Sequence, residues 1–144
     1  MTLPMIRRAF ADTPHGQIHY AWTGQGTPLL LLHQTPRSWA EYRLVMPILG
    51  KKYRVIAMDT VGFGDSYVPE AEGAIEAYAR GVVDFLGALS LPRVSLVGHH
   101  TGGVIALEVA AAYPHLVDRL VLSCTPYVDA EDSERRFIVR FVTQ

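Results

Sequence analysis

The sequence predicts an α/β fold with a mostly parallel sheet flanked by helices. Three short apolar runs, Pro28–Leu32, Arg54–Met58 and residues 94–97, have the character of strands covered on both faces. Two segments with the helical spacing of apolar residues, 74–89 and 101–113, alternate with them. Because strands that alternate with helices pair in parallel through right-handed crossovers, we expect a single sheet with helices packed on it.

Three further elements complete the expected order. Residues 17–22 alternate polar and apolar side chains, which is typical of a half-buried strand. Ser38 and Glu41 have the spacing of a capping box, so a helix is expected to open there and to end at Gly50. A final strand is expected over residues 120–123.

Composition and charge exclude several classes of function. The chain has 144 residues, of which 49% are hydrophobic, and its 13 basic and 14 acidic side chains give a formal net charge of −1. Nucleic acids and anionic membranes require a basic surface, so neither is expected as a partner. The single cysteine, Cys124, cannot form an internal disulfide and fits a reducing cytoplasm. Apolar runs such as Pro28–Leu32 are too short to span a bilayer.

Three loops are expected at the carboxyl ends of the parallel strands, where open α/β sheets bind their ligands. They are residues 33–36 (HQTP), 59–66 (DTVGFGDS) and 98–103 (GHHTGG). In this order they resemble the H-G-x-P, D-x-x-G-x-G-x-S and G-x-S-x-G loops of the α/β-hydrolase superfamily. The resemblance is to the branch of haloalkane dehalogenases, epoxide hydrolases and small esterases, and it implies a hydrolase that uses no cofactor.

The third loop departs from that pattern at its central residue. Gly98 and Gly102 fit the two small positions, which places His100 where the superfamily carries a serine, cysteine or aspartate nucleophile. The turn requires a positive φ at this position. An alternative register centres the turn on Thr101, but it places the bulky His99 in a small position.

His100 is the predicted catalytic residue, with two chemical roles open to it. An imidazole can attack an acyl carbon, or it can act as a general base on water. A helix N-terminus directly behind it would favour the neutral, nucleophilic ring. The alternative is that the nucleophile has been lost and that His100 only lines a ligand pocket.

The resemblance also implies an oxyanion hole made by the backbone N–H groups of Thr35 and Thr101. His33, Gln34 and His99 are the other expected pocket residues, with His33 bracing its loop through hydrogen bonds. Gln34 stands where the superfamily usually has glycine. No metal site is expected, although two or three of the neighbouring imidazoles could in principle hold Zn²⁺. A small, fairly apolar ester or other carbonyl compound is the expected substrate.

The resemblance implies that a large part of the superfamily fold lies beyond this chain. Residues 1–129 correspond to the N-terminal part of the core, and 130–144 to the start of a cap helix. The acid and the histidine of the usual triad have no counterpart here, so the chain is expected to be a fragment. Three hypotheses remain: an enzyme, an inactive ligand-binding module, and a part-chain that needs its C-terminal half. If the short chain is natural, the edge strand from Leu120 to Ser123 is expected to join two copies in a homodimer.

Overall fold

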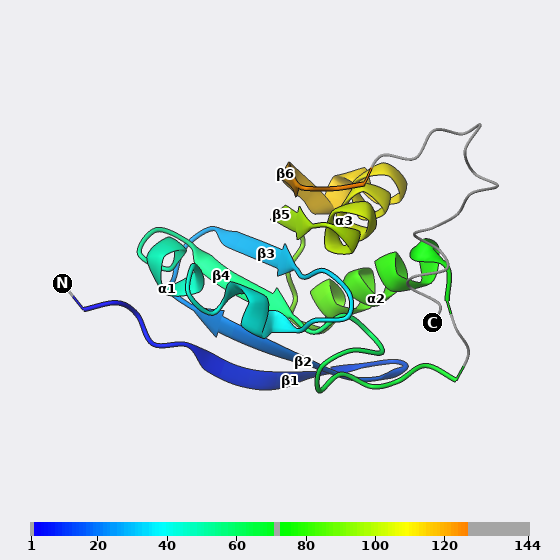
Figure 1. Cartoon of the computed structure of the whole chain (residues 1–144), viewed down its shortest axis with the longest axis horizontal. Coiled ribbons are helices and arrows are strands. Elements are labelled where there is room, and N and C mark those ends of the chain that lie inside the picture. Colours follow the sequence, from blue (N-terminus) through cyan, green and yellow to red (C-terminus); the bar gives the residue numbers. More distant parts are fainter. Residues whose placement is uncertain (1, 71–72, 127–144) are drawn as a thin grey trace.

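A computed structural model describes residues 2–70 and 73–126 of the chain, which form a six-stranded sheet with helices on both faces (Figure 1). The strands are β1 (Arg7–Thr13), β2 (Gly16–Thr23), β3 (Pro28–Leu32), β4 (Arg54–Met58), β5 (Val94–His99) and β6 (Val117–Ser123). Their order across the sheet is β1-β2-β4-β3-β5-β6. β4, β3, β5 and β6 run parallel, and β1 and β2 form antiparallel pairs. The expected α/β class with a mostly parallel sheet is therefore confirmed.

β1 is the strand that the sequence did not predict. It pairs with β2 as an antiparallel hairpin, with Arg7 opposite Trp22 and Thr13 opposite Gly16. It is an edge strand, and Ala11 is its one fully buried residue. Because so little of β1 enters the core, its sequence lacks the alternation of apolar residues that marks a half-buried strand.

The central strands follow the sequence closely. β3 and β4 have the predicted bounds, and Leu30, Leu32 and Ile56 are completely buried in them. β5 continues two residues beyond the predicted end at Val97. β6 begins three residues before the predicted start, at Val117, which pairs with Val94.

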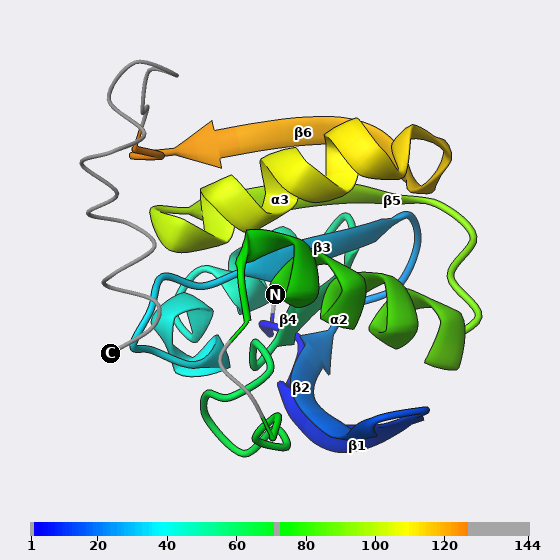
Figure 2. The ribbon, with the colours of Figure 1, turned by 90° about the vertical axis from the view of Figure 1, so that its right-hand side faces the viewer.

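Two helices cover one face of the sheet, as Figure 2 shows. They are α2 (Ile75–Ala88) and α3 (Thr101–Ala112), both close to their predicted bounds. The main core lies between these helices and the sheet, with Phe85 of α2 and Ile105 of α3 fully buried in it. A second, smaller core on the opposite face includes Leu31 and Met46.

The continuous helix expected from Ser38 to Gly50 is wrong. The segment forms a 3₁₀ turn at Trp39–Tyr42 and a short α1 at Met46–Leu49. Pro47 has no N–H to donate to the carbonyl group four residues earlier, so one helix cannot run through it. The predicted capping box is only half formed. The Ser38 hydroxyl accepts a hydrogen bond from the Ala40 N–H, whereas Glu41 accepts one from Gln34 instead of returning to Ser38.

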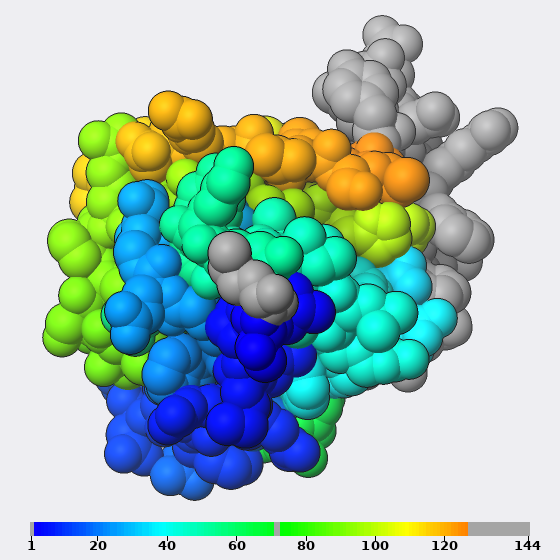
Figure 3. All heavy atoms as spheres, turned by 90° about the vertical axis from the view of Figure 1, so that its left-hand side faces the viewer, coloured from blue at the N-terminus to red at the C-terminus, as the bar shows by residue number. Residues whose placement is uncertain are grey.

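Among the described residues, β6 is the edge strand opposite β1, and Figure 3 shows it in orange along the top of the molecule. Two of its apolar side chains face solvent, with Val121 53% and Leu122 43% exposed. The segment 130–144, expected to begin a cap helix, lies outside the described residues. Among the helices of the described part, none combines the length and apolar character needed to cross a bilayer.

Candidate active site

The three predicted loops meet at one edge of the sheet because β3, β4 and β5 are parallel neighbours. The loop after β3 touches the start of α3, although Thr35 and Thr101 are 66 residues apart in sequence. The loop after β4 bonds to the loop after β3, since the Thr60 N–H donates to the ring of His33. The arrangement is that of a site at the carboxyl ends of the strands.

His100 occupies the tight turn between β5 and α3, with φ 51° and ψ −118°. Non-glycine residues seldom adopt this conformation, which the sequence predicted for position 100. The two flanking glycines make the turn possible. A Cβ on Gly98 would collide with the backbone of Gly102, and a Cβ on Gly102 would collide with the Leu32 carbonyl oxygen of β3.

The His100 imidazole is left with an unused nitrogen atom. Its Nδ1 is buried and has no hydrogen-bond partner among the residues that the structure describes. The backbone of His100 is fixed to β6, because its N–H donates to the Ser123 carbonyl oxygen at 2.9 Å. The ring therefore sits on a fixed turn, with a buried Nδ1 that no described residue bonds.

The two predicted oxyanion-hole residues lie against each other. The Thr35 N–H donates to the Thr101 hydroxyl oxygen at 2.7 Å, and the two hydroxyl oxygens are 3.1 Å apart. Both side chains are almost completely buried. The Thr35 amide thus points at the start of α3, and its hydrogen bond is made with a side chain of the protein itself. Thr101 begins α3, so its own N–H has no carbonyl four residues earlier in the helix to bond.

His33 braces the two loops, with both ring nitrogens occupied. Its Nδ1–H donates to the Gln34 carbonyl oxygen at 2.7 Å, and its Nε2 accepts the Thr60 N–H at 3.0 Å. Since a backbone N–H can only donate, Nε2 carries no proton and the ring is neutral. Burial lowers the pKa of His33 below its usual value, although the Gln34 carbonyl and the Asp59 carboxylate oppose this shift. His33 is therefore a structural residue in this geometry.

The other two predicted pocket residues have partners of their own. The His99 ring is 3.2 Å from the Ser123 hydroxyl and lines a largely apolar pocket with Leu31 and Val97. The backbone N–H of Gln34 donates to the Glu41 carboxylate, and its carbonyl oxygen accepts from the His33 ring. Because His33 has no free nitrogen, the three imidazoles do not form a joint zinc site, and the geometry gives no support to that alternative.

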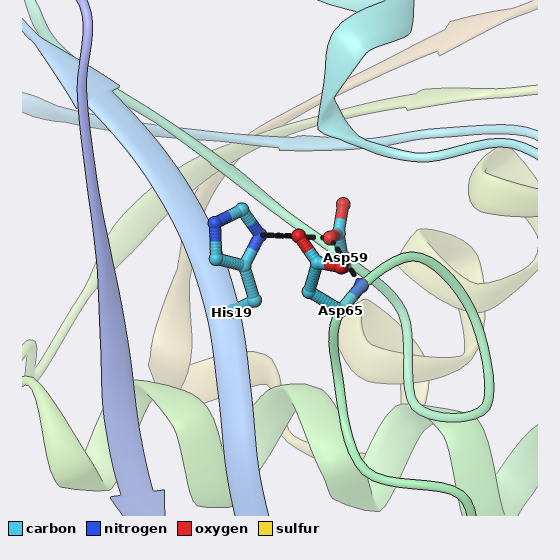
Figure 4. A group of neighbouring side chains, drawn as sticks. All are labelled: His19, Asp59 and Asp65. Atoms are coloured by element: carbon cyan, nitrogen blue, oxygen red, sulfur yellow. Dashed lines mark hydrogen bonds and ion pairs between the residues drawn. The ribbon is translucent and has the colours of Figure 1, made fainter.

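A buried network around Asp59 was not predicted from the sequence (Figure 4). Asp59 accepts hydrogen bonds from the ring of His19 at 2.8 Å, the Trp39 N–H at 2.7 Å and the Asp65 N–H at 3.0 Å. His19 Nε2 accepts from the Arg8 guanidinium at 3.0 Å, so the ring proton is on Nδ1 and is donated to Asp59. The sequence signal was weak, because His19 and Asp59 are 40 residues apart in the sequence.

Three residues of this network have the side chains of a cation site. Ligand atoms of His19, Asp59 and Asp65 lie within 4.8 Å of one another. However, the Arg8 guanidinium is 2.9 Å from the Asp65 carboxylate and also bonds the remaining nitrogen of His19. Arg8 already supplies a positive charge beside this cluster, and His19 Nδ1 is bonded to the Asp59 carboxylate. The network is thus a brace that ties the loop after β4 to the β1–β2 hairpin and to the segment after β3.

Comparison with known proteins agrees with this architecture. A family model described as the alpha/beta hydrolase fold matches residues 27–142. A soluble epoxide hydrolase of Corynebacterium sp. is 38% identical over 106 residues, covering 74% of this chain and 37% of that protein. A 2-hydroxy-6-oxo-2,4-heptadienoate hydrolase of Pseudomonas putida is 42% identical over 103 residues, covering 69% of this chain and 37% of that protein.

Solved structures give the same result. The epoxide hydrolase CorEH superimposes with a TM-score of 0.83 at 34% identity, covering 89% of this chain and 46% of that one. The chain thus spans less than half of the length of each of these relatives. The order of the strands, the glycine-flanked elbow and the extent of these matches together show that this chain belongs to the α/β-hydrolase fold family, on the side of the epoxide hydrolases and meta-cleavage product hydrolases.

Proposed function

We propose that this chain carries the reacting residue of an α/β-hydrolase that acts on a small, fairly apolar ester or related carbonyl compound. The observation that carries the proposal is the position of His100. It holds the strained elbow conformation between Gly98 and Gly102, and its Nδ1 has no partner in the described part of the chain. The names of the relatives, an epoxide hydrolase and a dienoate hydrolase, support hydrolysis of small organic molecules.

His100 has two routes to hydrolysis. As a nucleophile, a ring nitrogen attacks the acyl carbon, the alcohol leaves, and water then cleaves the acyl-imidazole to release the acid. As a general base, the ring takes a proton from water while the water oxygen attacks the acyl carbon; the acyl–oxygen bond then breaks, and the alcohol leaves with the proton that the ring returns. In both routes the carbonyl oxygen gains negative charge, which the N–H groups of Thr101 and Thr35 would stabilise.

The test is hydrolysis of para-nitrophenyl acetate and its longer acyl homologues by the 144-residue chain. We expect His100→Ala to lower kcat/KM by at least about 100-fold, because a positioned acid or base supplies that much or more. Free imidazole also cleaves such esters, so His15→Ala is the matched control, with a histidine side chain that is 64% exposed. Equal rates for His100→Ala and the parent chain would refute the proposal. Acylated His100 in a mass spectrum would identify the nucleophilic route.

A second candidate function is a ligand-binding module without turnover. The contact that favours it is the hydrogen bond from the Thr35 amide to the Thr101 hydroxyl, which leaves one backbone donor fewer for a substrate oxygen. Ligand binding with no hydrolysis by the parent chain would support this function.

A third candidate is a part-chain that becomes active only with a C-terminal half, since the chain spans 37% of the length of its matched relatives. Hydrolysis that appears only when such a half is added would support it. We infer a small molecule as the ligand and the cytoplasm as the location, with neither nucleic acid nor membrane as partner. The near-neutral charge and the single cysteine support this inference.

A further inference from the structure

The Thr101 hydroxyl has a position that the proposed mechanism does not use. Donors of an oxyanion hole lie about 2.7–3.1 Å from the point that the charged oxygen will occupy. The Thr101 Oγ1 atom is 2.7 Å from the Thr35 nitrogen. With respect to the Thr35 amide, the side-chain oxygen of Thr101 therefore stands where a substrate oxygen would stand.

We propose that Thr101 decides how this site treats a ligand oxygen: its hydroxyl holds the oxyanion position beside the Thr35 amide, and a ligand oxygen bonds that amide only after displacing it. The inference rests on the proposed function, because it takes the Thr35 amide as an oxyanion donor. It adds a residue that sets the strength of oxyanion binding through a side chain, whereas the proposed hole uses only backbone groups.

The surroundings of Thr101 make this contact persistent. Thr35 holds the Thr101 oxygen with two groups, its N–H and its hydroxyl, the latter at 3.1 Å. Both residues are buried, and hydrogen bonds are stronger where water is excluded. A neutral ligand oxygen that displaces the Thr101 hydroxyl exchanges one hydrogen bond for another, so it gains little binding free energy. Displacement by an oxyanion replaces a neutral acceptor with a charged one, which bonds an N–H about twice as strongly. The site is thus selective for ligands that carry or develop negative charge on oxygen.

The test uses phenylphosphonate, an apolar molecule with a tetrahedral oxyanion, and follows the Thr35 amide by NMR. Thr101→Ala removes the competing oxygen and leaves the amide open. We expect the Kd of this variant for phenylphosphonate to fall by about 10-fold or more, since loss of one oxyanion donor lowers kcat by about 10²–10³. Binding should move the Thr35 amide proton downfield. Thr101→Ser keeps the hydroxyl and should show no such gain.

Two further variants separate occupancy from packing. Thr101→Val keeps the shape but offers no acceptor, so we expect faster hydrogen exchange at Thr35 without tighter phosphonate binding. This variant also keeps the test open if Thr101→Ala fails to fold. Thr60→Ala is the matched control, because it removes a buried threonine hydroxyl that has no partner among the described residues. Thr60→Ala should change neither the hydrogen exchange of the Thr35 amide nor the Kd for phenylphosphonate.

The outcomes also distinguish this inference from the proposed function. An equal Kd and an unchanged Thr35 shift in Thr101→Ala, or unchanged Thr35 exchange in Thr101→Val, would overturn the role of Thr101 whatever the esters show. Tighter phosphonate binding by Thr101→Ala together with no ester turnover would support Thr101 and reject hydrolysis. If both stand, Thr101→Ala should also raise kcat/KM on the activated esters by about 10-fold or more.

Discussion

His100 is held in a backbone conformation that is enforced from both sides by glycine. Gly98 and Gly102 leave no room for a Cβ, and the second of them touches the Leu32 carbonyl oxygen of β3. The elbow is therefore fixed by contacts between main chains, and the side chain at position 100 has no part in its formation. The family pattern could be detected in the sequence for this reason, despite the unusual residue at its centre.

The first prediction concerns Gly98. Gly98→Ala should lower the free energy of unfolding by about 3 kcal/mol or more, because the added Cβ meets backbone atoms that cannot move aside. Urea denaturation followed by circular dichroism measures this change. Gly87→Ala is the matched control in α2, where an added Cβ meets nothing within 4 Å. It should raise stability by up to about 1 kcal/mol, as alanine does in helices. Equal effects of the two substitutions would contradict the steric account of the elbow.

The second prediction concerns the pH dependence that comes from His33. Burial holds the pKa of His33 in the folded chain below 6.5, so near that pH the unfolded chain binds a proton at this ring more readily than the folded chain does. The stabilisation from neutral His33 is complete above pH 6.5 and is lost as the pH falls below it. The slope is at most about 1.4 kcal/mol per pH unit.

The measurement is the free energy of unfolding of the parent chain and of His33→Gln between neutral and mildly acidic pH. The variant should have a flatter pH dependence over this range. His15→Gln, which alters an exposed ring, should keep the slope of the parent chain. A parent chain and a His33→Gln variant with parallel curves would show that His33 titrates normally in the folded protein.

At the scale of elements, the Asp59 network joins three parts of the chain. Asp59 at the end of β4 accepts from His19 of β2, from the Trp39 N–H and from its own loop at Asp65. Because Arg8 of β1 bonds the far side of His19, the edge hairpin is tied to the loop that follows β4. The hairpin is thereby connected to the loops of the site without contributing a residue to it.

The third prediction follows from this network. Asp59→Ala leaves one buried and two partly buried donors unpaired and should cost about 3 kcal/mol in the free energy of unfolding. Asp65→Asn is the control, since its ion pair with Arg8 joins two side chains that are more than half exposed. Exposed pairs contribute about 0–1 kcal/mol, so this variant should stay close to the parent. Chemical denaturation of both variants checks the difference. A small effect of Asp59→Ala would mean that the loop is held by other contacts.

Sequence reasoning was most reliable for elements whose residues are buried. β3 and β4 were located to the residue, because an apolar run between polar loops leaves little choice of ends. β1 was missed because it buries one side chain. The single helix expected up to Gly50 is wrong, because the capping signal at Ser38 marks a helix start but does not show that Pro47 interrupts the segment.

The site was predicted in part for a similar reason. Glycines at 98 and 102 have a steric meaning that can be read locally, so the conformation of His100 was foreseen. The contact between Thr35 and Thr101 was not, because it depends on where the threonine side chain points after two distant segments meet. The pairing of Asp59 with His19 could not be predicted for the same reason, since the two residues are far apart in the sequence and meet only in the folded sheet.

At the scale of the whole molecule, the described chain has two unequal sheet edges. β1 exposes one large apolar side chain, Phe10, among charged ones, whereas β6 exposes two in succession, Val121 and Leu122, beside its unpaired backbone groups. Apolar edge strands tend to pair with another strand. The matched relatives are more than twice as long as the region that aligns with this chain, so further chain is available in them to cover this edge.

The fourth prediction concerns this edge. Produced alone, the 144-residue chain should self-associate through β6, and Leu122→Lys should weaken the association by placing a charge on the edge. Sedimentation velocity over a wide range of protein concentration measures it. Val68→Lys, at a loop residue that is 78% exposed, is the matched control and should associate like the parent. A parent chain that stays monomeric throughout the range would contradict the prediction.

The order of the strands also bears on how the site comes into being during synthesis. β3 lies between β4 and β5, so one of its two neighbours is made long after β3 itself. The Thr35 amide meets its partner only when a further 66 residues have left the ribosome. Until then β3 has an unpaired side. Closing such a distant contact is slow compared with forming a hairpin or a helix. We therefore expect the contact between Thr35 and Thr101 to form late in folding, and a nascent chain that stops before α3 lacks one of its two partners.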